Sequence, residues 1–245
     1  SVQLNLASAT VLQSMAGFTS MNSQTEVFDG HGLAMDRMYR FQRHIYDASR
    51  RFYLLGRDRL LDDLQPPHGG SVLAIGCGTG RNLGGAARRY PHAKLFGIDI
   101  SQEMLKSALA TMQGLSLEKT VKFACVDATV FDPALSLGQA KFDRIYFSYT
   151  LSMIPQWRAA LANALNLLTP AGELHIVDFG QCEQLPRGFR GLLFGWLGAF
   201  HVTPRADLAI VLGQLAKQGN LRVHFKSCYR GYSWLASIKP QAASQ

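Results

Sequence analysis

Residues 72–82 read VLAIGCGTGRN, and this stretch decides the fold. An apolar run leads into a glycine-rich turn and then into a segment with helical spacing, which predicts a strand, a tight turn and a helix. Gly76, Gly78 and Gly80 follow the spacing G-x-G-x-G. Glycines let the backbone turn sharply and approach a ligand, while the first amides of a helix offer donors to a carboxylate. The stretch therefore predicts a binding turn at the end of a buried strand.

Outward from this turn, short apolar runs alternate with segments of helical spacing. Helices are expected from about Asn82, from about Ser101 and over 156–168. The apolar runs are SVLAIG, KLFGIDI, VKFACVDA, FDRIYFSY and GELHIVDF, followed by two closing strands in LRVHFKSCYR and GYSWLASIK. Nearly unbroken apolar strands that alternate with helices predict an α/β fold with a mostly parallel sheet covered by helices on both faces.

The chain of 245 residues, 47% hydrophobic, is expected to bury one substantial core. We predict a flexible N-terminal arm over 1–30, an N-terminal helical lid over 31–66 interrupted at Gly56, and a main domain over 67–245 with inserted helices at about 183–219. The four cysteines are scattered, which favours reduced thiols in the cytoplasm and no metal site. The longest apolar block, 191–200, is half of the about 20 residues that cross a bilayer.

Acidic residues end the second and third predicted strands. Asp99 lies at the end of the strand in FGIDIS, where a carboxylate can accept hydrogen bonds from both hydroxyls of a ribose. Asp127 lies in VDAT, within reach of an adenine amino group. Nicotinamide-binding turns instead have the spacing G-x-G-x-x-G. The glycine turn after the first strand and the acids after the second and third strands together predict a site for S-adenosylmethionine.

Residues 71–178 resemble the class I S-adenosylmethionine-dependent methyltransferases, whose Rossmann-like fold has a seven-stranded, mostly parallel sheet. The chain departs from their pattern at Ala74, where the first strand usually ends with an acidic residue. The resemblance implies that S-adenosyl-L-methionine is the cofactor and S-adenosyl-L-homocysteine the product. It assigns cofactor binding to Gly76, Cys77, Gly78, Gly80, Asp99, Ile100, Met104, Asp127, Ala128 and Ser148.

A more specific resemblance covers residues 31–238. MDRMYRFQRHIYDASRRFYLLGRDRL at 35–60, FSYTLSMIPQW at 147–157 and FHVTPRADL at 200–208 are similar to the N-methyltransferase of betaine-lipid synthesis. That family methylates the amine of diacylglyceryl-homoserine three times. The resemblance implies a lipid substrate with an amine and a carboxylate in its headgroup, and a cytoplasmic enzyme held peripherally on the anionic inner face of the membrane.

The stretch at 35–60 combines arginines with aromatic residues and contains no lysine. Arginine binds carboxylates through two parallel hydrogen bonds, and aromatic rings can face a methylated ammonium. We therefore expect Tyr46, Tyr53 and Arg57 near the cofactor. The predicted catalytic residues are Tyr39, His44 and Tyr149, with Asp178 as a further candidate proton acceptor, and the predicted residues for the headgroup carboxylate are Arg43, His201 and Arg205.

Two features leave alternatives open. A helix in PRGFRGLLFGWLGAF can lie in a membrane interface or merely pack onto the sheet. The net charge of +8 fits an anionic partner, so a nucleic-acid-binding protein with a vestigial cofactor fold is one alternative, and methylation of a soluble amine or natural product is another. FSYTLSMIPQW lacks the Asp/Asn-Pro-Pro-Tyr/Phe pattern of adenine and glutamine methylases, so no nucleic-acid partner is expected.

Overall fold

The computed structural model describes residues 54–218 and 221–241. The predicted arm at 1–30 and most of the predicted lid at 31–66 lie outside these ranges. Five predicted site residues lie outside them as well: Tyr39, Arg43, His44, Tyr46 and Tyr53.

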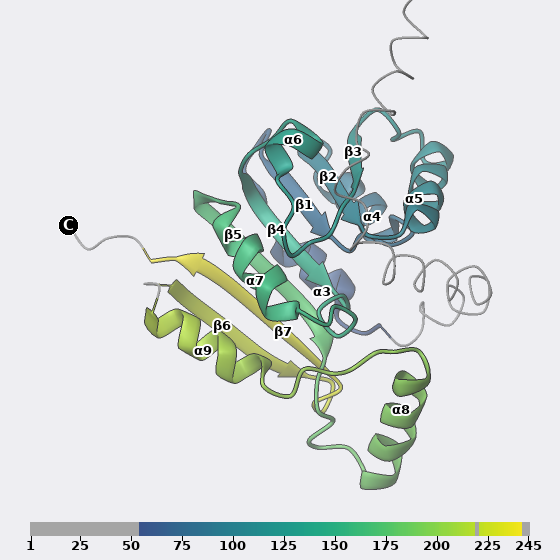
Figure 1. The fold of residues 1–245 in the computed structure, drawn as a ribbon, viewed down its shortest axis with the longest axis vertical. Coiled ribbons are helices and arrows are strands. Elements are labelled where there is room, and N and C mark those ends of the chain that lie inside the picture. Colours follow the sequence, from purple (N-terminus) through teal and green to yellow (C-terminus); the bar gives the residue numbers. More distant parts are fainter. Residues whose placement is uncertain (1–53, 219–220, 242–245) are drawn as a thin grey trace, which may run out of the picture.

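Seven strands form one sheet in the order β3-β2-β1-β4-β5-β7-β6 (Figure 1). β7 is antiparallel to both of its neighbours, while β1 to β5 pair in parallel. The strands are β1 Ser71–Ile75, β2 Lys94–Asp99, β3 Val121–Cys125, β4 Phe142–Ser148, β5 Leu168–Phe179, β6 Leu221–Cys228 and β7 Ser233–Pro240. The predicted α/β, Rossmann-like fold with a mostly parallel seven-stranded sheet is confirmed.

Helices cover both faces of this sheet (Figure 1). Buried side chains of α6, α7 and α9 pack on one face, and buried side chains of α3, α4, α5 and α8 belong to the cluster on the other face. The helices are α3 Arg57–Asp63, α4 Arg81–Arg89, α5 Gln102–Gly114, α6 Pro133–Leu137, α7 Trp157–Asn166, α8 Arg187–Ala199 and α9 Leu208–Gln218. The predicted insertion at about 183–219 corresponds to α8 and α9.

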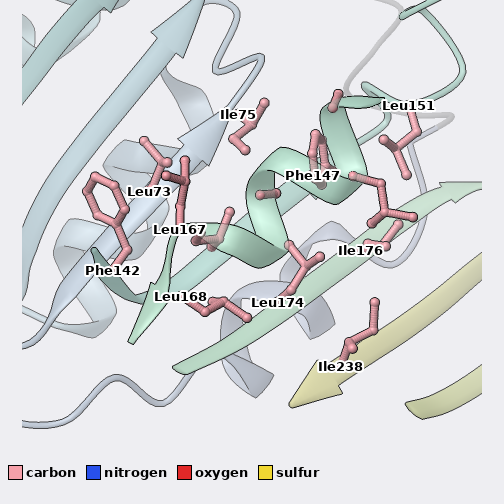
Figure 2. Packing of buried hydrophobic residues seen from close by; sticks show 14 of the residues in the cluster. Leu73, Ile75, Phe142, Phe147, Leu151, Leu167, Leu168, Leu174, Ile176 and Ile238 are labelled. Carbon is pink, nitrogen blue, oxygen red and sulfur yellow. The ribbon is translucent and has the colours of Figure 1, made fainter. Parts of the chain in front are cut away.

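Strand β1 is buried along its whole length, as its unbroken apolar sequence predicts. Leu73 and Ile75 pack in the cluster on the α7 face, together with Phe147 and Ile176 of the neighbouring strands (Figure 2). Burial of each such side chain contributes about 1.5–3 kcal/mol. This packing holds β1 and β4 side by side at the centre of the sheet and so fixes the positions of the loops that follow their carboxyl ends.

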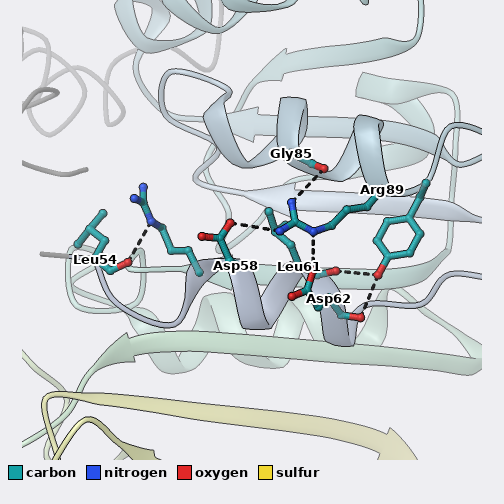
Figure 3. A network of polar contacts seen from close by, with 8 residues as sticks. Leu54, Asp58, Leu61, Asp62, Gly85 and Arg89 are labelled. Carbon is teal, nitrogen blue, oxygen red and sulfur yellow. Dashed lines mark hydrogen bonds and ion pairs between the residues drawn. The ribbon is translucent and has the colours of Figure 1, made fainter. Parts of the chain in front are cut away.

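Charged residues connect α3 to α4 at the edge of the opposite face. Arg89 Nε lies 2.6 Å from an Asp62 carboxylate oxygen, and its Nη2 lies 3.2 Å from Asp58 (Figure 3). The hydroxyl of Tyr90 donates to the Leu61 carbonyl at 2.8 Å. Gly56 precedes α3 with a φ of 87°, so the predicted interruption at this glycine marks the start of a helix.

Two local features differ from the sequence prediction. The helix predicted over 156–168 ends at Asn166, because Leu168 already pairs with Phe142 at the start of β5, before a register shift. Helix α6 was not predicted. Its five residues are too few to show a helical repeat, although Asp132 caps its first turn and Gly138 ends it in the left-handed conformation.

Within the described ranges, we find no helix with the length and apolarity needed to cross a membrane.

Candidate functional site

A pocket of about 430 Å³ opens beyond the carboxyl ends of the central strands. The strand order reverses between β1 and β4, which is where open α/β sheets bind their ligands. The loops after β1 to β4 line this pocket, together with the segment before α3. Nine of the predicted cofactor-binding residues line it: Arg57, Gly76, Cys77, Gly78, Asp99, Ile100, Asp127, Ala128 and Ser148.

The glycine turn takes conformations that suit glycine. Gly76 has a φ of 66°, and a Cβ atom there would lie 2.2 Å from Thr150 Cγ2. Gly78 and Gly80 also have positive φ values. The Cys77 amide donates to the Ile98 carbonyl at 2.9 Å, which anchors the turn to β2. The loop after β4 therefore packs against the turn so closely that only glycine fits at position 76.

Two carboxylates are held at the ends of β2 and β3. Asp99 accepts hydrogen bonds from the Gly78 amide at 2.8 Å and from the Ser101 amide at 3.0 Å, so it connects the glycine turn to the start of α5. Asp127 Oδ1 accepts from the amide and the hydroxyl of Thr129, both at 2.7 Å. Asn163 of α7 donates to the Ala128 carbonyl at 3.0 Å. Both acids are thus positioned by short-range contacts and line the pocket.

Ser148 and Tyr149 end strand β4 at the pocket. Ser148 Oγ is buried and has no hydrogen-bond partner in the part of the chain that the structure describes. Tyr149 has a φ of 57°, its ring centroid lies 4.6 Å from that of Phe179, and its hydroxyl donates to the Leu55 carbonyl. Burial raises the pKa of Tyr149 well above its usual value. Tyr149 lines the pocket, as predicted, but its hydroxyl keeps its proton and braces the segment before α3.

Two arginines bring positive charge to the pocket. Arg57 was predicted there, whereas Arg81 was not. Arg81 is the first residue of α4, and the first turn of this helix contains no acidic residue. A cation at the positive end of a helix is unfavourable unless an anion binds there. The position of Arg81 at the start of a predicted helix could therefore have marked it in the sequence as a candidate anion-binding residue. The glycine turn and these two arginines therefore bring backbone donors and positive charge to the pocket lining, which suits an anionic group.

Asp178 was a candidate proton acceptor, and the structure gives it another position. It is 2% exposed and is not among the described residues that line the pocket. Its carboxylate accepts from the Ser152 amide at 3.0 Å and from the Phe179 amide at 2.8 Å. Burial raises the pKa of Asp178 to about 6. The residue therefore holds the loop after β4 from within the protein and, among the described residues, does not line the pocket.

Four other predicted residues also lie away from the pocket. Met104 is buried in the core, and Gly80 forms the start of α4, packed against Ala108. His201 is exposed just after α8. Arg205 donates to backbone carbonyls of the loop after β4, as described below, so its Nε and Nη2 are already engaged. The sequence could not show that these four residues lie away from the pocket, because motif spacing and residue type do not report tertiary contacts.

Ala74, the departure from the usual acidic residue, is fully buried in β1 between Gly97 and Tyr146. Its methyl group belongs to the cluster on the α3 and α4 face of the sheet. The hydroxyl of Tyr146 is buried without a hydrogen-bond partner among the described residues. The pocket is therefore formed without a carboxylate at position 74.

Comparison with known proteins agrees with this geometry. Residues 72–172, from β1 to the start of β5, match the family described as methyltransferase domain. The plantazolicin methyltransferase BpumL, in complex with SAH and a triazolic desmethylPZN analogue, superposes with a TM-score of 0.62 at 16% identity, covering 87% of this chain and 98% of that one. The fold is that of the class I methyltransferases.

Curated relatives of this methyltransferase fold act on different acceptors by name. The nocamycin O-methyltransferase of Saccharothrix syringae is 35% identical over 134 residues, which are 53% of this chain and 45% of the relative. The ubiquinone/menaquinone biosynthesis C-methyltransferase UbiE of Desulfotalea psychrophila is 25% identical over 171 residues, 68% of this chain and 66% of the relative. The chain spans less than half the length of several relatives that it matches.

Proposed function

We propose that the chain binds S-adenosylmethionine in this pocket and transfers its methyl group to an acceptor. The observation that carries the proposal is the pair Asp99 and Asp127, held at adjacent strand ends around a glycine turn and lining one pocket. The volume of about 430 Å³ lies within the roughly 300–1,000 Å³ of small-molecule sites. The buried hydroxyl of Ser148 in the pocket wall has no partner among the described residues, which supports a polar ligand there.

The residues present suit the parts of such a nucleoside. Asp99 would accept hydrogen bonds from the ribose hydroxyls, and Asp127 and Ala128 would receive the adenine. The glycine turn, with Arg57 and Arg81, would bind the methionine carboxylate. Bound S-adenosylmethionine would supply a methyl group on a sulfonium: an acceptor lone pair would attack the methyl carbon in line with the S–CH3 bond, and the neutral thioether S-adenosylhomocysteine would leave.

The chain's own contribution to such a transfer is orientation. An attacking amine must be neutral, so it has to lose a proton first. Among the described residues at the pocket, burial raises the pKa of the Cys77 thiol and of Tyr149, and both stay protonated near neutral pH. These two groups therefore accept no proton, and we assign that role to water or to the predicted catalytic residues Tyr39 and His44 outside the described ranges.

We further propose that the acceptor is the amino group of a lipid headgroup, diacylglyceryl-homoserine, which is methylated to the trimethylated betaine lipid. The resemblance of residues 31–238 to that family supports this acceptor, and so does the outer face of α8. Phe189 and Leu192 are 45% and 75% exposed there, next to Arg187 and Arg190. Exposed apolar residues with flanking cations suit an anionic lipid surface, while Leu197 of the same helix packs in the core; Figure 1 shows where α8 lies.

Methylation of a soluble small molecule is the second candidate. The curated relatives favour it, because their names include an O-methyltransferase for nocamycin and trans-aconitate 2-methyltransferases.

The deciding experiment incubates the protein with methyl-labelled S-adenosylmethionine and a bacterial lipid extract that contains diacylglyceryl-homoserine. We expect the label in the lipid fraction, as mono-, di- and trimethylated products resolved by mass spectrometry. Label that appears only in water-soluble compounds would favour the second candidate. If calorimetry detects no binding of S-adenosylmethionine at millimolar concentration, the proposed activity is wrong.

Membrane contact through α8 is tested separately with vesicles. We expect Leu192→Glu to reduce co-sedimentation with vesicles of anionic phosphatidylglycerol about tenfold, because it places a negative charge in the apolar contact. Leu135→Glu is the matched control, since Leu135 is 87% exposed on α6, at the opposite end of the molecule from α8 (Figure 1). Equal binding of both variants would exclude α8 as the contact.

A further inference from the structure

The loop after β4 forms one wall of the proposed cofactor pocket. Thr150, Met153, Ile154, Pro155 and Gln156 all line the pocket. The amides of Met153 and Ile154 donate to the Thr150 carbonyl at 2.9 and 3.2 Å, so this loop begins as a tight turn. Such a turn leaves several carbonyls without partners inside the loop itself. Its shape therefore depends on what those carbonyls bind.

Arg205 binds these carbonyls from the insertion between β5 and β6. Its Nε donates to the Leu151 carbonyl at 2.9 Å, and its Nη2 donates to the Ile154 carbonyl at 2.6 Å. The Thr203 amide donates to the Ser152 carbonyl between them at 2.8 Å. The segment that connects α8 to α9 thus satisfies three carbonyls of the loop after β4.

Asp178 holds the same turn from the end of β5. Its carboxylate accepts the Ser152 amide, while Ser152 presents its carbonyl to Thr203. The turn is therefore fixed by an acid on one side and by a guanidinium on the other. Lysine could not replace Arg205 here, because a single ammonium lacks the planar fork whose separate nitrogens reach two diverging carbonyls.

We propose that Arg205 is a positioning residue that sets the shape of the pocket wall and so couples the α8–α9 insertion to cofactor binding. The inference rests on the proposed function for its effect on binding, although its effect on the turn is independent of it. It replaces the expectation that Arg205 binds a substrate carboxylate. Without the guanidinium, the carbonyls of Leu151 and Ile154 lose their partners, and the turn has to relax toward other donors.

The test compares Arg205→Ala and Arg205→Lys with the control Arg158→Ala. Arg158 is an exposed cation of α7 that pairs with Asp207, so its removal changes the charge in the same region without touching the turn. Two quantities are measured: the affinity for S-adenosylhomocysteine by calorimetry, and the hydrogen exchange of the Met153 and Ile154 amides. Exchange in α5 serves as the internal reference.

We expect Arg205→Ala to weaken binding about tenfold and to speed exchange of these two amides by a similar factor, with α5 unchanged. Arg205→Lys should lie between, because an ammonium can satisfy one carbonyl, and it keeps the test valid if the alanine variant does not fold. Wild-type affinity and wild-type exchange in both variants would overturn the proposal. If the wild type binds no nucleoside, the proposed function fails, and the exchange measurement alone still decides the role of Arg205.

Discussion

The two halves of the pocket are built in different ways. On the side of β1 to β3, the carboxylates at the strand ends accept hydrogen bonds from the same or a neighbouring motif, as Asp99 does from Gly78, 21 positions away. On the side of β4 and β5, the wall is held by contacts such as the one from Arg205 to Leu151, across 54 positions. The first half is specified by residue type at fixed spacing, whereas the second depends on how distant segments fold together. This difference explains why the proposed cofactor is easier to infer than the acceptor.

The halves also differ in how their carboxylates are placed. Asp99 and Asp127 line the pocket and accept hydrogen bonds from the loops that follow their strands. Asp178 ends β5 in an equivalent position along the chain, yet it is enclosed by the loop after β4. An acid at a strand end therefore lines the pocket on one side, whereas on the other side it is buried and holds a loop.

Replacement of Gly76 is the strongest way to break the first half. Gly76→Ala requires a Cβ atom 2.2 Å from Thr150 Cγ2 and a left-handed backbone, which together cost roughly 1–3 kcal/mol or more. We expect the affinity for S-adenosylhomocysteine to fall more than about 100-fold, measured by calorimetry, because the turn must move.

The control for this variant is Gly69→Ala. Gly69 has a φ of 70°, but a Cβ atom there has no neighbour within 4 Å. It should show the backbone cost in thermal unfolding and bind the nucleoside normally. Equal losses of affinity in both variants would show that the close contact with Thr150 has no part in binding.

Asp99→Asn tests whether the carboxylate at the end of β2 acts on a ribose. The amide keeps the size of the side chain but can accept fewer hydrogen bonds, and one of the two backbone amides that Asp99 accepts would then face its NH2 group. We expect about 30-fold weaker binding of S-adenosylhomocysteine by calorimetry. Asp132→Asn is the control, since Asp132 also accepts a backbone amide, at 2.8 Å, but at the start of α6 outside the pocket. Unchanged affinity in Asp99→Asn would remove Asp99 from the site.

Arg81→Gln sharpens the comparison within the proposed cofactor site. If Arg81 binds the methionine carboxylate, its loss should weaken S-adenosylhomocysteine about tenfold and leave 5′-methylthioadenosine, which lacks that carboxylate, unaffected. Calorimetry with both ligands measures the difference. Arg88→Gln, in the last turn of the same helix, removes the same charge away from the pocket and should change neither affinity. A parallel loss for both ligands would mean that Arg81 acts only on the fold.

The sequence predicted most of the fold because its signals are local. The unbroken apolar run of β1, the glycine turn and the acids after β2 and β3 each predict their structure within about ten residues. Helix α6 escaped because five residues are too short for a periodic pattern, although Asp132 and Gly138 marked its ends.

The acceptor side was predicted less well because residue type does not report what a side chain contacts. Arg205 was assigned to a headgroup carboxylate and Asp178 to accepting a proton, but both hold the loop after β4. Tyr149 was assigned to catalysis, and its hydroxyl instead braces the Leu55 carbonyl. Arg81 was overlooked, although a cation at the start of a helix departs from the usual charge preference and indicates a possible anion site. Only tertiary contacts distinguish these roles.

The buried acid of the second half should also show in the pH dependence of stability. Burial raises the pKa of Asp178 from 3.8 to about 6, so its contribution to stability is fully present below about pH 4 and is lost as the pH rises through 6. Asp178→Asn cannot ionise, and between pH 4.5 and 7.5 its free energy of unfolding should therefore fall by on the order of 1 kcal/mol less than that of the wild type. Urea denaturation at the two pH values measures this difference, and the contribution of His175 is common to both proteins. A pH dependence that is identical in the two proteins would mean that Asp178 titrates at its ordinary pKa, as a carboxylate exposed to the pocket would, and the contrast between the two halves would disappear.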